Sequence, residues 1–201
     1  MSEKQPVRIA IFASGTGTNA RQLLQHFKHS EVAKVSLVVS NRRQSGVFES
    51  GPAFGVPTYL LTGQTYRDGE LLVKLMAAHR IQLIVLAGYL KLIPPELVQA
   101  FPRRIVNIHP SLLPRHGGQG MYGPRVHEAV LNARDPESGI TIHYVDEVYD
   151  QGEIILQEKL TVDPAWNAAQ LQQAIHQLEY QHFPQVVEKV CREMHLRADK
   201  S

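Results

Sequence analysis

The chain has 201 residues, of which 43% are hydrophobic and 20% charged, and its formal net charge is +2 at pH 7. This composition is ordinary for a soluble globular protein, and the charge is too small to indicate a nucleic-acid or membrane partner. The single cysteine, Cys191, excludes an internal disulfide framework and indicates a reducing compartment. We expect one cytoplasmic domain over residues 1–201, with no signal peptide and no apolar run near the roughly 18 residues of a membrane span.

The first half of the chain alternates apolar runs of strand length with helical patterns. Residues 7–13 are β-branched and almost continuously apolar, as expected of a strand covered on both faces. Similar patterns predict further strands over 34–40, 58–61, 81–88 and 103–110, and helices over 18–27, 47–55, 68–80 and 94–101. This order predicts a right-handed, mostly parallel, Rossmann-like α/β sheet flanked by helices.

The second half departs from this alternation. A helix is predicted over 126–133, strands over 139–147 and 152–162, and a long C-terminal helix from about residue 167. Two strands joined by a short connection cannot be parallel neighbours, so we expect an antiparallel element at one edge. Cys191 is expected to be buried in the last helix, and the first few residues and 194–201 to be loosely attached.

A glycine-rich turn, "FASGTGTNA", follows the first strand and opens the first helix. Gly15, Gly17 and Ala20 fit the pattern in which backbone N–H groups and a helix N-terminus hold a phosphate. Thr18 and Asn19 can add side-chain donors. A tight turn without a ligand is the alternative.

A dinucleotide site would require an acidic residue at the end of the second strand, to bind a ribose diol. That strand ends in "SNRRQ", and Arg42 and Arg43 leave an NADP 2′-phosphate open as an alternative. The better match is a phosphate site without a dinucleotide.

The segment "NIHPSLLPRHGGQGMYG" carries the chemistry. Asn107 and His109 point to one face of a strand, at the carboxyl end where α/β sheets bind ligands. An amide donor beside an imidazole suits a carbonyl under attack, with Asn107 holding the oxyanion and His109 moving a proton. Pro110 and Pro114 stiffen the exit from the strand.

Metal binding is the rival interpretation of the histidines, but their spacing matches no known zinc motif and no cysteine pair supports one. His143, in the middle of a strand, is expected to be a hydrogen-bonded core histidine. His116 and His127 are expected in a loop and on a helix surface, respectively.

A catalytic histidine usually needs a carboxylate that orients it or raises its pKa. Asp150 precedes x-Gly at a turn into a strand, so its side chain can reach inward. Asp146 and Glu147 are expected to be solvated charges at a strand end. Asp150 is therefore the predicted partner.

Several motifs, in order along nearly the whole chain, resemble the glycinamide ribonucleotide (phosphoribosylglycinamide) formyltransferases of purine biosynthesis. They are "FASGTGTN", "VVSNR", "LIVLAGYLKLIP", "NIHPSLLP", "GITIHYVDEVYDQGEIILQ" and "LEYQHFPQVV". The resemblance implies formyl transfer from 10-formyltetrahydrofolate, as co-substrate and without a metal, to the amine of glycinamide ribonucleotide.

The resemblance implies binding and catalytic roles for individual residues. Gly17, Thr18, Asn19 and Glu179 match residues that bind the ribonucleotide. Leu90, Lys91, Leu92 and Ile93, together with Asn107, match the folate site, while Asn107, His109 and Asp150 match the catalytic trio.

Two departures from the family pattern concern the folate tail and one loop. Arg67 is the candidate for an arginine that meets the folate tail, but the local alignment is ambiguous. The glycine-rich loop 115–123 replaces a shorter loop, and is expected to be mobile and to flank the substrate cleft.

Two rival functions remain at this point. Methionyl-tRNA formyltransferase shares "SLLPR" but ordinarily carries a further C-terminal domain. A non-catalytic phosphate- or nucleotide-binding regulatory domain would not need Asn107, His109 and Asp150 together. The expected partners are small-molecule substrates, with no nucleic acid or membrane, and the protein is expected to be a monomer or a homodimer.

Overall fold

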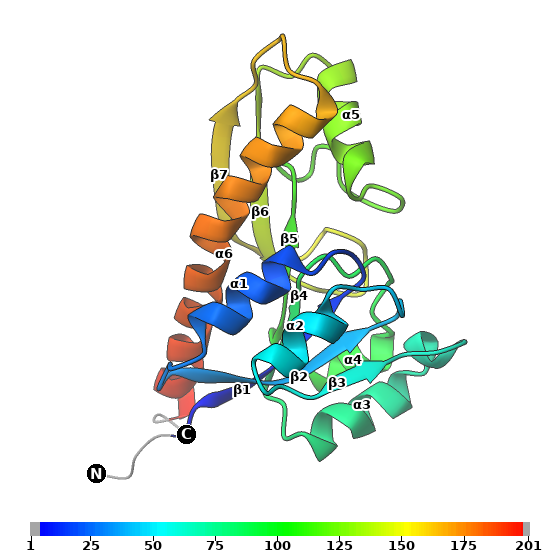
Figure 1. The fold of residues 1–201 in the computed structure, drawn as a ribbon, viewed down its shortest axis with the longest axis vertical. Coiled ribbons are helices and arrows are strands. Elements are labelled where there is room, and N and C mark those ends of the chain that lie inside the picture. Colours follow the sequence, from blue (N-terminus) through cyan, green and yellow to red (C-terminus); the bar gives the residue numbers. More distant parts are fainter. Residues whose placement is uncertain (1–4, 199–201) are drawn as a thin grey trace.

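The structure, a computed structural model, describes residues 5–198 and is built around one seven-stranded sheet (Figure 1). In chain order the strands are β1 Val7–Ala13, β2 Ala33–Ser40, β3 Thr58–Leu60, β4 Leu83–Leu86, β5 Ile105–His109, β6 Glu137–Tyr144 and β7 Ile154–Thr161. The helices are α1 Thr18–His26, α2 Val47–Ala53, α3 Gly69–Ala78, α4 Pro95–Ala100, α5 Pro124–Asn132 and α6 Ala168–Ala198, with a 3₁₀ turn at Thr65–Arg67. Every helix and strand predicted from the sequence is present.

Strand β1 shows why the parallel strands are apolar on both faces. Val7, Ile9 and Ile11 belong to the core that α1 and α6 cover, whereas Ala10 and Phe12 belong to the core under α3 and α4. Side chains alternate between the faces of a strand, so a strand covered by helices on both sides is apolar at every position. The predicted α/β sheet flanked by helices is confirmed.

The strand order places a topological switch point at β1. The order is β3-β2-β1-β4-β5-β6-β7, so the chain first moves outward from β1 and then returns to its other side with β4. The connections that leave the carboxyl ends of β1 and β4 therefore run apart. Open α/β sheets bind their ligands in the crevice that forms there.

The predicted antiparallel edge is also confirmed. Strand β6 pairs antiparallel with both β5 and β7, whereas the pairs among β1 to β5 are parallel. In the β5–β6 register, Asn107 is opposite His143 and His109 is opposite Thr141. A residue of β6 thus comes beside the predicted catalytic residues of β5.

The C-terminal helix is longer than expected. Cys191 is buried as predicted, but α6 continues to Ala198, so the expected loose attachment is wrong for 194–198. Met194 packs against the core, and His195 Nε2 donates to the carbonyl oxygen of Val32 at 3.0 Å. Residues 1–4 and 199–201 lie outside the described residues. Within 5–198, no helix combines the length and apolar character needed to cross a membrane.

Candidate active site

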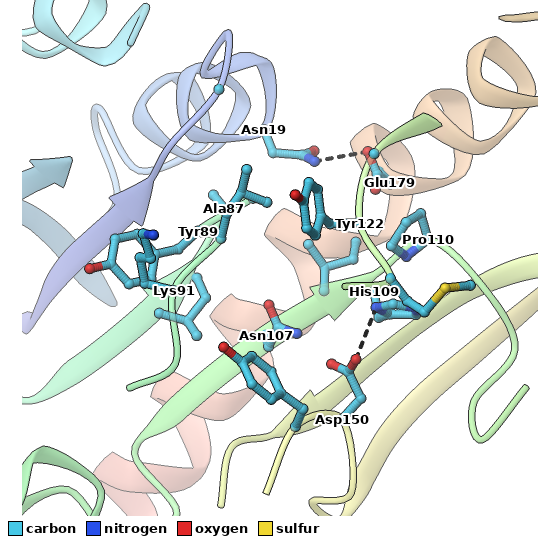
Figure 2. Close-up of a pocket in the computed structure, with 18 of the residues that line it drawn as sticks. Asn19, Ala87, Tyr89, Lys91, Asn107, His109, Pro110, Tyr122, Asp150 and Glu179 are labelled. Carbon is cyan, nitrogen blue, oxygen red and sulfur yellow. Dashed lines mark hydrogen bonds and ion pairs between the residues drawn. The ribbon is translucent and has the colours of Figure 1, made fainter. Parts of the chain in front are cut away.

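A cavity of about 480 Å³ opens at the carboxyl ends of β1, β4 and β5. One wall is formed by the glycine turn after β1 and by the segment after β4, and another by the end of β5. The opposite side is closed by loop 115–123, by the β6–β7 connection and by α6 (Figure 2). Apart from the folate-tail candidate Arg67, the site residues that the resemblance implies line this cavity: Gly17, Thr18, Asn19, Leu90, Lys91, Leu92, Ile93, Asn107, His109, Asp150 and Glu179.

The glycine turn presents the N-terminus of α1 to the cavity. Gly17 precedes the helix with φ 78°, no side chain caps the helix, and its first turn contains no acidic residue. The N–H groups of such a turn lack intrahelical acceptors and attract an anion. Packing also favours glycine at position 17, since a Cβ there would lie 2.9 Å from Val47 Cγ1 and 3.2 Å from Val47 N.

Asn19 and Glu179 meet across the cavity. The amide of Asn19 donates to Glu179 Oε2 at 2.8 Å, which joins the start of α1 to α6 (Figure 2). The predicted side-chain donor of the glycine turn is therefore engaged by a second predicted site residue. Burial raises the pKa of Glu179 to about 7, and the Asn19 hydrogen bond limits this rise.

The segment after β4 forms an apolar shelf with main-chain groups along it. The N–H of Leu90 donates to Ser14 Oγ at 3.0 Å, which fixes the segment against the end of β1. Ile93 is buried, whereas Leu92 remains 42% exposed at the cavity. Such a surface suits a flat, partly apolar ligand.

Tyr66 lies beside this shelf and orders two cations. Lys91 Nζ is 4.9 Å from the centre of its ring, and the guanidinium of Arg67 is 5.4 Å from it. Lys91 lines the main cavity, but Arg67 does not. Arg67 and Lys91 therefore both lie against Tyr66, but only Lys91 has a direct cavity contact.

Asn107 is held by a histidine from the neighbouring strand. Asn107 Nδ2 lies 3.1 Å from His143 Nε2, and His143 Nδ1 lies 2.8 Å from the carbonyl oxygen of Tyr144. A carbonyl oxygen only accepts, so neutral His143 carries its proton on Nδ1 and accepts from the Asn107 amide at Nε2. The amide keeps its second N–H for another acceptor.

His143 is buried and hydrogen-bonded, as predicted, but it also belongs to the site. Its Nε2 lies 3.6 Å from Asp150 Oδ1. A single signal could have revealed this role: the antiparallel edge predicted from the sequence allows a β6 residue to lie opposite Asn107. The strand register that makes the contact could not be predicted.

Asp150 reaches inward from the β6–β7 connection, as predicted. It has a positive φ of 55°, and Gly152 lets the chain pass so close to Tyr144 that a Cβ would lie 1.8 Å from its carbonyl oxygen. Asp150 Oδ2 accepts from the N–H of Gly118 at 2.9 Å and lies 3.5 Å from His109 Nδ1 (Figure 2). Asp146 and Glu147 are exposed, as expected.

The environment of Asp150 keeps its carboxylate ionised. Burial opposes ionisation, but the His143 ring 3.6 Å away, the charge of His109 and the N–H of Gly118 outweigh it, so the pKa of Asp150 is lowered. The buried negative charge is thus compensated by the groups around it.

His109 faces a hydrogen-bond acceptor at each ring nitrogen. Its Nε2 lies 2.8 Å from the carbonyl oxygen of His116, so Nε2 carries a proton and donates it. Burial lowers the pKa of His109, while the charge of Asp150 and the His116 carbonyl oppose this change. Nδ1, beside Asp150, is therefore the nitrogen at which the ring gains or loses a proton.

Loop 115–123 flanks the cavity, as predicted, and contacts His109 and Asp150 from that side. Gly118, Met121 and Tyr122 line the cavity, and the loop provides the His116 carbonyl and the Gly118 N–H described above. The sequence alone did not indicate these main-chain contacts.

The expectation that His127 lies on a helix surface is wrong. Its side chain is buried with Val126 and Val130, because this face of α5 packs against α6. It lines the cavity, and burial lowers the pKa of His127 to about 4. His116 lies in the loop, as expected. Among residues 5–198, no group of three or more His, Cys, Asp or Glu side chains is arranged to hold a metal ion.

The chain matches a known protein family over most of its length. The family model described as formyl transferase matches residues 7–187. A chloroplastic phosphoribosylglycinamide formyltransferase of Arabidopsis thaliana is 38% identical over 197 residues, which cover 95% of this chain and 68% of the relative. The phosphoribosylglycinamide formyltransferase of Bacillus subtilis is 34% identical, with 91% and 94% covered.

Solved structures agree in fold over nearly the whole chain. The phosphoribosylglycinamide formyltransferase of Bacillus halodurans superposes with a TM-score of 0.82 at 35% identity, covering 91% of this chain and 94% of the other. The glycinamide ribonucleotide transformylase 1 of Symbiobacterium toebii superposes with a TM-score of 0.87 at 27% identity, covering 96% and 94%.

Proposed function

The chain belongs to the formyl transferase family, and we infer that it is a phosphoribosylglycinamide formyltransferase. It transfers the formyl group of 10-formyltetrahydrofolate to the amine of 5′-phosphoribosylglycinamide, a step of purine biosynthesis. One observation carries the proposal: the His109 ring and the Asp150 carboxylate, 3.5 Å apart, share a single cavity with an anion-binding helix N-terminus and an apolar shelf.

The ribonucleotide is assigned to the side of β1 and α6. Its phosphate would accept hydrogen bonds from the main chain of Gly17, Thr18 and Asn19, where the helix dipole also favours negative charge. Glu179, already bound to Asn19, would meet the polar groups of the substrate. The amine of the glycinamide then extends toward the end of β5.

The folate is assigned to the shelf after β4. Leu90, Leu92 and Ile93 would cover the faces of the pterin, and the main-chain groups between them would bind its polar edge. Lys91, beside Tyr66, is the cation of this segment that is available to the acidic tail of the folate.

The chemistry begins with attack of the neutral amine on the formyl carbon. A C–N bond forms, and negative charge develops on the formyl oxygen. The free N–H of Asn107, whose amide His143 holds in place, donates to this oxyanion, and the positive charge of the protonated His109 ring stabilises it electrostatically.

Collapse of the intermediate breaks the bond between the formyl carbon and the folate nitrogen. The amine loses one proton and the folate nitrogen gains one, so His109 returns to its starting state after moving a proton at Nδ1. The ionised Asp150 beside Nδ1 favours the imidazolium form that this transfer requires.

The deciding experiment is a formyl-transfer assay with purified protein, 5′-phosphoribosylglycinamide and 10-formyltetrahydrofolate. Formate plus ATP replaces the donor in one control, and methionyl-tRNA replaces the acceptor in another. We expect product only with the folate donor and the ribonucleotide. Formylation of methionyl-tRNA, or tight ribonucleotide binding without any transfer, would favour the rival functions instead.

We further propose a domain organisation, a cellular location and an oligomeric state for the enzyme. We take residues 1–201 to act as one catalytic domain in the cytoplasm, as a monomer or a homodimer, on small molecules and without a nucleic-acid partner. Sedimentation of the purified protein over a range of concentrations measures the oligomeric state.

A further inference from the structure

We propose that Asp135 is a positioning residue that holds the His116 carbonyl against His109 and thereby selects the nitrogen at which His109 exchanges its proton. Asp135 lies after α5, is almost fully buried and has no part in the chemistry described above. The inference rests on the proposed catalytic role of His109.

Asp135 binds two consecutive residues at the start of loop 115–123. Its Oδ1 accepts from the guanidinium of Arg115, and its Oδ2 lies 2.7 Å from His116 Nε2. Hydrogen bonds to an ionised carboxylate are stronger than those between neutral groups. A buried carboxylate with both oxygens engaged in this way anchors the start of the loop to the protein interior.

The backbone at His116 needs such support. Its φ is 53°, in the left-handed region that costs a residue with a Cβ free energy and persists only where surrounding contacts enforce it. Ser111 Oγ adds a hydrogen bond to the carbonyl oxygen of Arg115 at 2.7 Å. The loop is thus held on both sides of the residue whose carbonyl faces His109.

The consequence for His109 concerns its tautomer. The His116 carbonyl is 2.8 Å from Nε2, whereas the Asp150 carboxylate is 3.5 Å from Nδ1, so the shorter contact places the proton of a neutral ring on Nε2 and leaves Nδ1 basic beside Asp150. Without that acceptor the proton could occupy Nδ1, and Nε2 would become the basic nitrogen. The titratable groups that face His109 are Asp150, His143, His116 and His127.

The main test is Asp135→Asn, which keeps the side-chain volume and removes the charge. In the unliganded protein at alkaline pH, ¹⁵N spectra of the ring should show one tautomer of His109 in the wild type and a mixture in the variant. The spectrum of His109→Gln identifies which signals belong to His109. Misplacement of a catalytic group can cost about 100-fold, so we expect kcat to fall by up to that factor with little change in KM.

Glu137→Gln is the matched control. Glu137 is also a paired carboxylate, two residues away, but it forms an exposed ion pair with Lys159 at 3.2 Å. Its loss should leave the His109 tautomer and kcat unchanged.

His116→Asn is the second variant, and it decides the question if Asp135→Asn does not fold. Asparagine tolerates a positive φ but lacks the imidazole that binds Asp135, so the same tautomer mixture is expected. A folded variant of either kind that retains a pure Nε2–H tautomer would overturn the inference, as would a wild-type ring protonated on Nδ1. Because these spectra need no substrate, failure of the formyl-transfer assay would count against the proposed function alone.

Discussion

The two sides of the cavity act by different physical means. On the side of β5 and β6, charged and polar side chains are joined to one another: Asp150 lies within 3.6 Å of both His109 and His143. On the side of β1 and β4, main-chain N–H groups and an apolar shelf are the main groups that face a ligand. Substitutions on the first side should therefore lower turnover, and those on the second should weaken binding.

The largest effect is expected on the β5–β6 side. His109→Ala and Asp150→Ala should each lower kcat by about 10²- to 10⁴-fold, because proton transfer by a positioned group contributes that much. Steady-state kinetics measures the change, and thermal melting shows whether the fold is retained. Glu147→Ala, at an exposed carboxylate of the same connection that does not line the cavity, is the control that should turn over normally. Near-normal rates in both site variants would remove the catalytic assignment.

On the β1 side, Gly15→Ala tests binding through the main chain. Gly15 lines the cavity, and a Cβ there meets no atom within 4 Å, so the protein should fold and the methyl group should crowd the phosphate. We expect about a tenfold increase in the Kd of the ribonucleotide, about 1.4 kcal/mol, with kcat almost unchanged. Calorimetry gives the affinity; an unchanged Kd would place the phosphate elsewhere.

Gly17→Val is a poorer test of phosphate binding than Gly15→Ala. Its Cβ would contact the backbone nitrogen of Val47 at 3.2 Å, and the positive φ of 78° disfavours a β-branched residue. We expect a lower melting temperature along with any loss of affinity. Comparison of the two glycine variants separates the structural requirement from ligand binding.

Glu179 is the exception on the binding side, because it is an ionisable side chain in a buried position. Its pKa is raised to about 7, so the folded protein binds more protons than the unfolded chain between the ordinary value of 4.5 and about 7. The free energy of unfolding should therefore fall as pH rises through this window. Glu179→Gln removes the ionisation and should make the protein more stable than the wild type above this window, by up to about 3 kcal/mol.

Urea unfolding of wild type and Glu179→Gln at acidic and alkaline pH measures this difference. Glu70→Gln, at a carboxylate whose side chain is 80% exposed, should have the pH dependence of the wild type. Equal pH dependence in wild type and Glu179→Gln would show that the ionised form of Glu179 is stabilised by further groups in addition to Asn19.

The smallest effect is expected at the folate shelf. Leu92 is 42% exposed, so Leu92→Ala should change the free energy of unfolding by no more than about 0.5 kcal/mol. It should still raise the KM for the folate a few-fold, because apolar contact with the pterin is lost. Ile93→Ala, at a residue only 3% exposed, should instead cost about 2–5 kcal/mol of stability. A folate KM unaffected by Leu92→Ala would remove Leu92 from the folate site.

The comparison also explains which parts of the site could be predicted. Asn107 and His109 share a face because strand periodicity is two, and that relation follows from the sequence alone. Asp150 was predicted from a turn pattern and reaches His109 as expected. His143 was assigned only to the core, because its position opposite Asn107 depends on a strand register that no local pattern specifies.

His127 shows a second limit. A histidine on a short helix is compatible with either a surface or a buried position, and His127 is buried because α5 packs against α6.

The loop contacts are a third feature that could not be predicted from the sequence. The His116 carbonyl and the Gly118 N–H are main-chain groups that every residue carries, so their roles arise only from where the chain passes.

The amino-acid sequence by itself therefore determined the order of strands and helices, the parallel sheet with its antiparallel edge, and the residue types proposed to carry the chemistry. These are local properties, set by periodicity, turn residues and the chemistry of single side chains. Tertiary structure alone decided which groups touch His109 and Asn107, how far α6 extends and where Glu179 is buried. Each of these depends on contacts between segments far apart in the chain, whose distances and burial arise only when the whole sheet is assembled.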